Sequence, residues 1–195
     1  MLYVDPSCPF AWITSRWLSE VQAQIPIELS IRLMSISVLN EDRDLEPWYR
    51  DFNDRAWGPA RLLAAAAETH GEQVIGDLYG ALGRRIHVQR QDFAAEVAVA
   101  ALAEAGLLTS LAGAAGSTAY DGYLRRSHLE AVESLGDEAG TPMIHLDGKP
   151  LFGPVLTQIP RGEQAVAVFD AVRTLSGCSA WADLRRPREP QLVLS

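Results

Sequence analysis

DPSCPFAWITSRW, residues 5–17, places one cysteine directly before a predicted helix. The apolar residues Leu2–Val4 just before it predict a short strand. Pro9 suits the first turn of a helix, because that position needs no backbone N–H. From Trp12 to Val21 the apolar residues recur at helical spacing. The pattern therefore predicts a strand followed by a helix, with Cys8 at the N-terminus of the helix.

The segments that follow predict more strands and a long helical region. Residues 27–33 alternate apolar and polar side chains, and a right-handed crossover would make this second strand parallel to the first. Residues 57–135 are rich in alanine and leucine and predict several helices. Two short strands, Met143–Leu146 and Pro150–Phe152, are predicted on either side of Asp147-Gly148, a dipeptide typical of hairpins.

The end of the chain completes the predicted architecture. A last helix is predicted over 161–175, and we expect the tail 185–195 to wrap the surface. Strand, helix, strand, helical block, hairpin and helix in this order predict an α/β protein with a thioredoxin-like fold and an inserted helical domain. We expect the thioredoxin-like domain to comprise 1–54 and 137–195, and the helical insertion domain to comprise 55–136.

The composition argues against several classes of partner. The chain has 195 residues, a formal net charge of −8 and a pI near 5.0. A negatively charged protein repels phosphate on average, so we expect no nucleic acid and no anionic membrane as partner. No run approaches the roughly 20 apolar residues that span a bilayer, and the N-terminal residues do not resemble a secretory signal. We therefore expect a cytoplasmic protein with small-molecule partners.

The cysteines and histidines form no recognisable metal or disulfide motif. Cys8 and Cys178 lie near opposite ends of the chain, unlike the cysteines of a disulfide framework. His87, His128 and His145 are too far apart in the sequence for a typical metal-ligand spacing. We expect no bound metal and no tightly bound cofactor.

Cys8 is the candidate nucleophile. The N–H groups and the dipole of a helix N-terminus favour a thiolate, so the sequence predicts a pKa below the ~8.5 of a free cysteine. The alternative is a buried cysteine that acts as a small apolar residue. Thr141-Pro142 stands directly before a predicted strand, where proline serves a turn or a cis bond. In thioredoxin-like folds such a cis-proline faces the cysteine, so we expect Thr141-Pro142 to be cis and beside Cys8.

Four segments resemble the mycothiol-dependent nitroreductase group of the DsbA family. They are DPSCPFAWITSRW (5–17), RAWGPARLLAAAAETHG (55–71), AYDGYLRRSHLEAV (119–132) and GTPMIHLDGKPLFGPVLTQIPRGE (140–163). In that group the first segment reads Cys-Pro-Trp-Cys. Here Cys8 and Pro9 match, Phe10 stands for the tryptophan, and Ala11 replaces the second cysteine. The resemblance implies the fold of DsbA and of kappa-class glutathione transferases, a thioredoxin-like fold with an inserted helical domain.

The resemblance also implies a set of site residues. Cys8 would be catalytic, and the substrate and thiol would bind at Pro9, Phe10, Trp57, Thr141 and Pro142. Trp57, in the segment RAWGP, would lie over the cysteine at the start of the helical insertion; otherwise it is a core tryptophan.

The implied function is that of a thiol-dependent oxidoreductase. With Ala11 in place of a resolving cysteine, Cys8 would act as a monothiol that forms a mixed disulfide with mycothiol or a similar low-molecular-weight thiol, and a second thiol molecule would release it. The substrate would be a small electrophile or disulfide, and the resemblance suggests nitroaromatic reduction. Two alternatives stay open: an enzyme like the kappa-class glutathione transferases or isomerases, and a thioredoxin-fold binding protein without turnover. A monomer and a homodimer are both compatible with the sequence.

Overall fold

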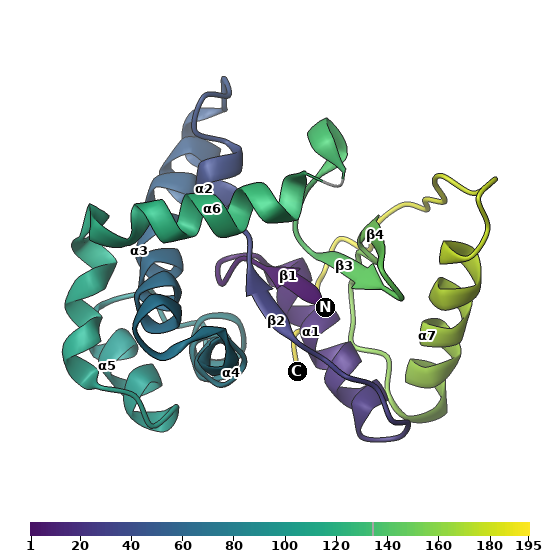
Figure 1. The fold of residues 1–195 in the computed structure, drawn as a ribbon, viewed down its shortest axis with the longest axis horizontal. Helices are drawn as coiled ribbons and strands as arrows, with labels where there is room; N and C mark the ends of the chain where they lie inside the picture. Colours follow the sequence, from purple (N-terminus) through teal and green to yellow (C-terminus); the bar gives the residue numbers. More distant parts are fainter. Residues whose placement is uncertain (134) are drawn as a thin grey trace.

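A four-stranded mixed sheet lies at the centre of the fold (Figure 1). The computed structural model describes residues 1–133 and 135–195. The strands are β1 Leu2–Val4, β2 Ile31–Leu33, β3 Met143–Leu146 and β4 Lys149–Phe152. They lie in the order β2-β1-β3-β4, with β1 and β2 parallel and the other neighbours antiparallel. The predicted parallel pair and the predicted hairpin are therefore confirmed.

The second strand is shorter than the sequence predicts. Only Ile31–Leu33 of the predicted strand 27–33 is a strand, because β1 has three residues and each pairs with one residue of β2. The β3–β4 turn follows its sequence signal. Asp147 and Gly148 have φ angles of 50° and 78°, the left-handed conformations that a two-residue hairpin turn requires.

The first and last long helices of the fold pack against each other. α1 spans Pro9–Gln22 and α7 spans Gly162–Ser176, each beginning within one residue of its predicted start. Trp17 of α1 is fully buried, and its Nε1 donates a hydrogen bond of 2.9 Å to the Ala165 carbonyl of α7. The Trp17 and Phe169 rings lie 6.2 Å apart. These contacts join the first and last helices of the fold.

The other helices make up most of the region between β2 and β3. They are α2 Ile36–Leu39, α3 Pro47–His70, α4 Ile75–Gly83, α5 Ala95–Glu104 and α6 Asp121–Val132. Shorter helical turns are η1 Glu72–Val74, η2 Arg84–Val88, η3 Thr109–Gly116, η4 Thr118–Tyr120 and η5 Gly136–Glu138. Figure 1 shows α3, α4 and α5 grouped beyond the β2 edge of the sheet, and α7 beyond β4.

The helical block begins earlier in the chain than the predicted insertion. α3 starts at Pro47, so it crosses the boundary that the sequence places at residue 55. Residues 62–67 of α3 are fully or almost fully buried and anchor the block to the core. Within the described part of the chain, no helix is both long enough and apolar enough to cross a bilayer.

Candidate active site

Cys8 caps the N-terminus of α1. Its backbone is extended, with φ −83° and ψ 114°, and Pro9 opens the helix. The Ala11 N–H donates a hydrogen bond of 3.5 Å to Cys8 Sγ. On its other side, Sγ lies 3.5 Å from the Thr141 carbonyl oxygen, in a position to donate its S–H proton. The sulfur is therefore held between a helix N–H and a backbone carbonyl that is distant in the sequence.

The Thr141-Pro142 peptide bond is cis, as predicted, and stands directly before β3. The Asp5 N–H donates a hydrogen bond of 3.3 Å to Thr141 Oγ1, so this loop contacts the Cys8 loop through backbone and side chain. The predicted juxtaposition of Thr141-Pro142 and Cys8 is confirmed. Among the predicted thiol-binding residues, Thr141 contacts the sulfur through its carbonyl, Pro142 follows it across the cis bond, and Pro9 follows Cys8 as the first residue of α1.

Burial raises the pKa of the Cys8 thiol to about 11, in the direction opposite to our prediction. Desolvation of the thiolate is the largest cause, because Cys8 is only 7% exposed, and the nearby Asp5 carboxyl also raises the pKa of the thiol. The N–H groups of Ala11 and Phe10 lower the pKa of Cys8, as a helix N-terminus predicts, but burial outweighs them. The predicted thiolate is thus wrong for the free protein, and Cys8 is protonated at neutral pH.

The pH dependence of alkylation tests this state. In a Cys178→Ser background, the rate of Cys8 alkylation by iodoacetamide should rise with pH to a midpoint near 11. At pH 7.5 such a pKa leaves roughly 1 thiolate in 3,000 molecules, so alkylation should be far slower than for a free thiol. Asp5→Asn should move the midpoint down, because it removes a charge that raises the pKa; Asp51→Asn, at an exposed acid of α3, is the matched control. A wild-type midpoint at or below ~8.5 would contradict the structure.

Asp5 is a buried carboxyl next to the cysteine that the sequence analysis did not single out. It is fully buried, and burial raises its pKa to about 7. Its two oxygens accept hydrogen bonds from the N–H groups of Ser7, at 2.7 Å, and Ile36, at 2.8 Å. Asp5 therefore ties the Cys8 loop to the start of α2. The signal in the sequence was an aspartate followed by Pro-Ser, because Asp side chains commonly accept from the N–H two residues on.

Aromatic side chains enclose the site on the side of the helical block. Trp12, one turn after Cys8, is 3% exposed and stacks on the His87 ring, with 5.8 Å between centroids. Tyr79, which is fully buried, packs against the same indole at 6.2 Å. His87 Nε2 lies 2.9 Å from the Pro6 carbonyl oxygen, which can only accept, and burial lowers the pKa of His87 to about 4. His87 is thus a neutral hydrogen-bond donor that fixes the loop before Cys8.

The C-terminal tail lies over the start of α1. The Arg188 guanidinium sits 4.9 Å from the centre of the Phe10 ring, and Trp12 Nε1 donates a hydrogen bond of 2.9 Å to the Leu194 carbonyl. The Val193 N–H donates to the Thr157 carbonyl at 2.9 Å. The predicted wrapping of the tail is confirmed, and the tail contacts two side chains near the start of α1, Phe10 and Trp12.

The recorded contacts of Trp57 are with two arginines of the helical block. Its ring lies under two guanidinium groups, those of Arg61 at 4.8 Å and Arg125 at 5.5 Å. Arg61 is paired with Asp121 at 2.7 Å, and Arg125 with Glu41 at 2.6 Å. These contacts tie Trp57 to α6, and none recorded among the described residues joins it to Cys8. A role of Trp57 in thiol binding stays a prediction.

Two comparisons identify the family of this fold and site. A family model described as "Rv2466c-like: Mycothiol-dependent nitroreductase Rv2466c" matches residues 7–186. The chain belongs to the Rv2466c-like family. A relative from Mycobacterium tuberculosis (strain ATCC 25618 / H37Rv), "Uncharacterized protein Rv2286c", is 31% identical over 192 residues, which cover 96% of this chain and 81% of that protein. The family name implies dependence on mycothiol.

This Rv2466c-like protein has one sulfur at the site. Ala11 is fully buried and contributes only its N–H to Cys8. Cys178 is an exposed free thiol that follows α7. Within residues 1–133 and 135–195, no cluster of three or more His, Cys, Asp or Glu side chains could hold a metal ion.

Proposed function

We propose that this protein is a thiol-disulfide oxidoreductase in which Cys8 acts as a monothiol nucleophile toward a disulfide or another small electrophile. The observation that carries the proposal is the place of Cys8 Sγ, between the Ala11 N–H and the carbonyl of Thr141, the residue before the cis-proline. The low-molecular-weight thiol is mycothiol or a close analogue, which the name of the matching family supports.

The reaction consists of two thiol-disulfide exchanges. In the first, Cys8 Sγ attacks the mycothiol sulfur of a substrate–mycothiol disulfide. A Cys8–mycothiol disulfide forms, the old S–S bond breaks, and the Cys8 proton ends on the leaving substrate thiol. In the second, a free mycothiol attacks the adduct, which restores the Cys8 thiol and releases mycothiol disulfide. Overall, one free mycothiol is consumed, the substrate leaves as a thiol, and the free mycothiol leaves joined to the one that the substrate carried, as mycothiol disulfide.

The protein's own groups position the sulfur for these steps. The Thr141 carbonyl accepts the S–H hydrogen bond in the resting state, and the Ala11 N–H stabilises negative charge on Sγ as the proton leaves. Because burial keeps the resting thiol protonated, ligand binding must accompany its activation. A protonated thiol is also protected from oxidation between turnovers.

We also propose a division of the chain into a thioredoxin-like domain and a helical insertion. The order of the strands and helices supports a thioredoxin-like domain that contains β1–β4, α1 and α7, with an inserted helical domain that begins with α3 at Pro47 instead of at residue 55, the arrangement of DsbA and kappa-class glutathione transferases. In this arrangement the cysteine loop and the cis-proline loop belong to the thioredoxin-like domain.

Intact-mass analysis tests the function. After incubation with mycothiol disulfide, the Cys178→Ser variant should gain one mycothiol at Cys8, whereas the Cys8→Ser variant can carry an adduct only at the exposed Cys178. Reduction by excess mycothiol should remove the adduct. Parallel incubations with glutathione disulfide test the choice of thiol. An adduct carried only by Cys178, or none on either variant, would contradict the proposal.

A transferase like the kappa-class glutathione transferases is the second candidate, and the protonation of Cys8 favours it. A protonated Cys8 can donate a hydrogen bond to the thiolate of a bound thiol, which then attacks the electrophile itself. Under this scheme Cys8→Ser keeps much of the activity, because a hydroxyl donates as well. Under the disulfide scheme the same variant has none.

A further inference from the structure

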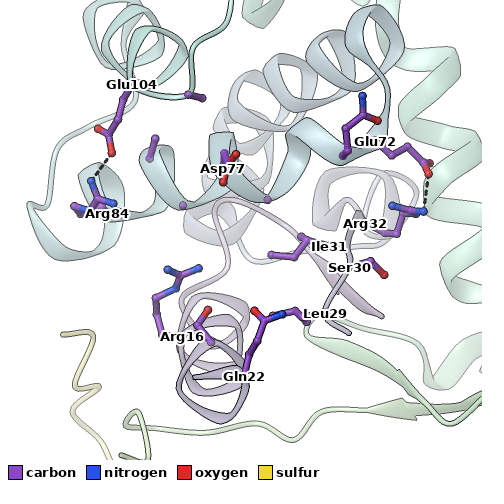
Figure 2. A pocket seen from close by; sticks show the side chains of 16 residues that line it. Arg16, Gln22, Leu29, Ser30, Ile31, Arg32, Glu72, Asp77, Arg84 and Glu104 are labelled. Atoms are coloured by element: carbon purple, nitrogen blue, oxygen red, sulfur yellow. Dashed lines mark hydrogen bonds and ion pairs between the residues drawn. The ribbon is translucent and has the colours of Figure 1, made fainter. Parts of the chain in front are cut away.

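A second polar site lies along the C-terminal half of α1, whereas Cys8 caps the N-terminus of this helix. A cleft of about 890 Å³ opens between α1, the edge strand β2 and α4 (Figure 2). Its lining includes Arg16 of α1, Arg32 of β2 and Asp77 of α4, but no residue of the Cys8 loop or of the cis-proline loop. The volume is in the range of small-molecule sites.

Arg16 is the arginine of this cleft that forms no ion pair with the described residues. Arg32 is paired with Glu72 at 2.8 Å, and Arg84 is paired with Glu104. Among the described residues, Arg16 has no carboxylate within ion-pair distance. Its guanidinium contacts Ser15 Oγ at 3.3 Å and the Trp12 ring at 4.6 Å. A partly buried guanidinium without a carboxylate is unfavourable until an anion pairs with it, and its geometry suits a carboxylate or phosphate.

Two glycines of α4 form part of the cleft floor. Gly76 and Gly80 lie one turn apart on α4, and both line the cleft. A Cβ added at either glycine would meet no atom within 4 Å. Glycine is less favourable than alanine inside a helix, and here no neighbouring side chain requires it. Because the two glycines have no side chains, a ligand in the cleft could approach the α4 backbone closely.

The remaining lining groups are hydrogen-bonding ones. Figure 2 shows Asp77 on α4 across the cleft from Arg16, and Gln22 and Ser30 nearby at the α1 and β2 walls. Asp77 forms no ion pair with the described residues. Carboxylate, amide and hydroxyl groups in one cleft match a ligand with several hydroxyls.

We propose that this cleft binds a sugar-sized polyhydroxylated anion, with the carboxylate or phosphate held by Arg16, the hydroxyls held by Asp77 and Gln22, and the ligand lying against Gly76 and Gly80. The site goes beyond the proposed thiol chemistry, because it uses no group of the Cys8 site. A Cys8→Ser variant should therefore bind the same ligand unchanged.

Isothermal titration calorimetry with three probes tests the site: glucuronate, glucose 6-phosphate and uncharged glucose. At least one anion should bind saturably, and glucose should not; the two anions distinguish carboxylate from phosphate. Arg16→Gln should weaken binding by about tenfold or more. Arg55→Gln, at an exposed arginine paired with Asp51, should not change it. Equal binding by Arg16→Gln, equal binding of glucose, or no saturable binding of either anion would overturn the proposal.

A second variant keeps the test independent of the Trp12 contact of Arg16. The double substitution of Gly76→Ala and Gly80→Ala places two methyl groups in the cleft floor while favouring the helix. It should raise the midpoint temperature of thermal unfolding and at the same time weaken binding of the anion. A stabilised variant that binds as tightly as the wild type would show that the glycine floor does not contact a ligand.

Discussion

Ala11→Cys should convert the site from a monothiol to a dithiol. Ala11 lies one helical turn after Cys8, its N–H already contacts Sγ, and residues with this spacing approach within disulfide distance. A thiol introduced there would act on the mixed disulfide at an effective concentration of roughly 1 mM or more. The variant should therefore release mycothiol without added thiol, form a disulfide between Cys8 and the introduced thiol, and gain protein-disulfide exchange activity.

The measurement is mass spectrometry of the preformed adduct in thiol-free buffer. Wild-type protein should keep the adduct, whereas Ala11→Cys should lose its mycothiol and end two hydrogens lighter than its fully reduced form. Ala11→Ser, of similar size but without a thiol, is the control and should keep the adduct. If the wild type released mycothiol as fast as the variant, the monothiol account would fail and Cys178 would be the first candidate for a resolving thiol.

Trp12→Ala should lower the free energy of unfolding by about 3–5 kcal/mol. The indole is almost fully buried, packs on His87 and Tyr79, and holds the tail through Leu194. The substitution leaves a cavity next to Cys8 and removes the tail contact. Equilibrium unfolding in urea measures the loss, and Trp12→Phe should lose less because it keeps a ring.

Gly83 at the end of α4 makes this test specific. A Cβ at Gly83 would overlap the Trp12 ring, so Gly83→Ala alone should destabilise the protein by about 1–3 kcal/mol. In the Trp12→Ala background the clash is absent, and the same change should stabilise it by up to ~1 kcal/mol. Gly76→Ala, with no atom near its Cβ, should stabilise both backgrounds. An equal cost of Gly83→Ala in both backgrounds would show that Trp12 does not pack on α4.

Local signals predicted the parts of the fold that they control. Pro9 marks the start of α1 and Asp147-Gly148 marks the β3–β4 turn, because each residue type has a backbone preference independent of the rest of the chain. The length of β2 was not predictable in this way. An alternating pattern marks residues suited to a strand, but their pairing depends on the length of the neighbouring strand.

The electrostatics of the site depended on distant segments. The helix N-terminus acts on Cys8 as expected, but burial, which the local sequence does not encode, outweighs it. The Thr141 loop meets the sulfur from 133 residues away, and His87 reaches the Pro6 carbonyl from 81 residues away. Short motifs place the cysteine at the helix, whereas the tertiary packing determines its protonation.

The rate at which the Cys8–mycothiol adduct disappears, measured against mycothiol concentration, tests the central claim most directly. A monothiol site has no internal route of release, so the observed rate constant in a Cys178→Ser variant should rise linearly with mycothiol and extrapolate to zero without it. A clear non-zero intercept, or a rate that does not depend on mycothiol, would contradict the account.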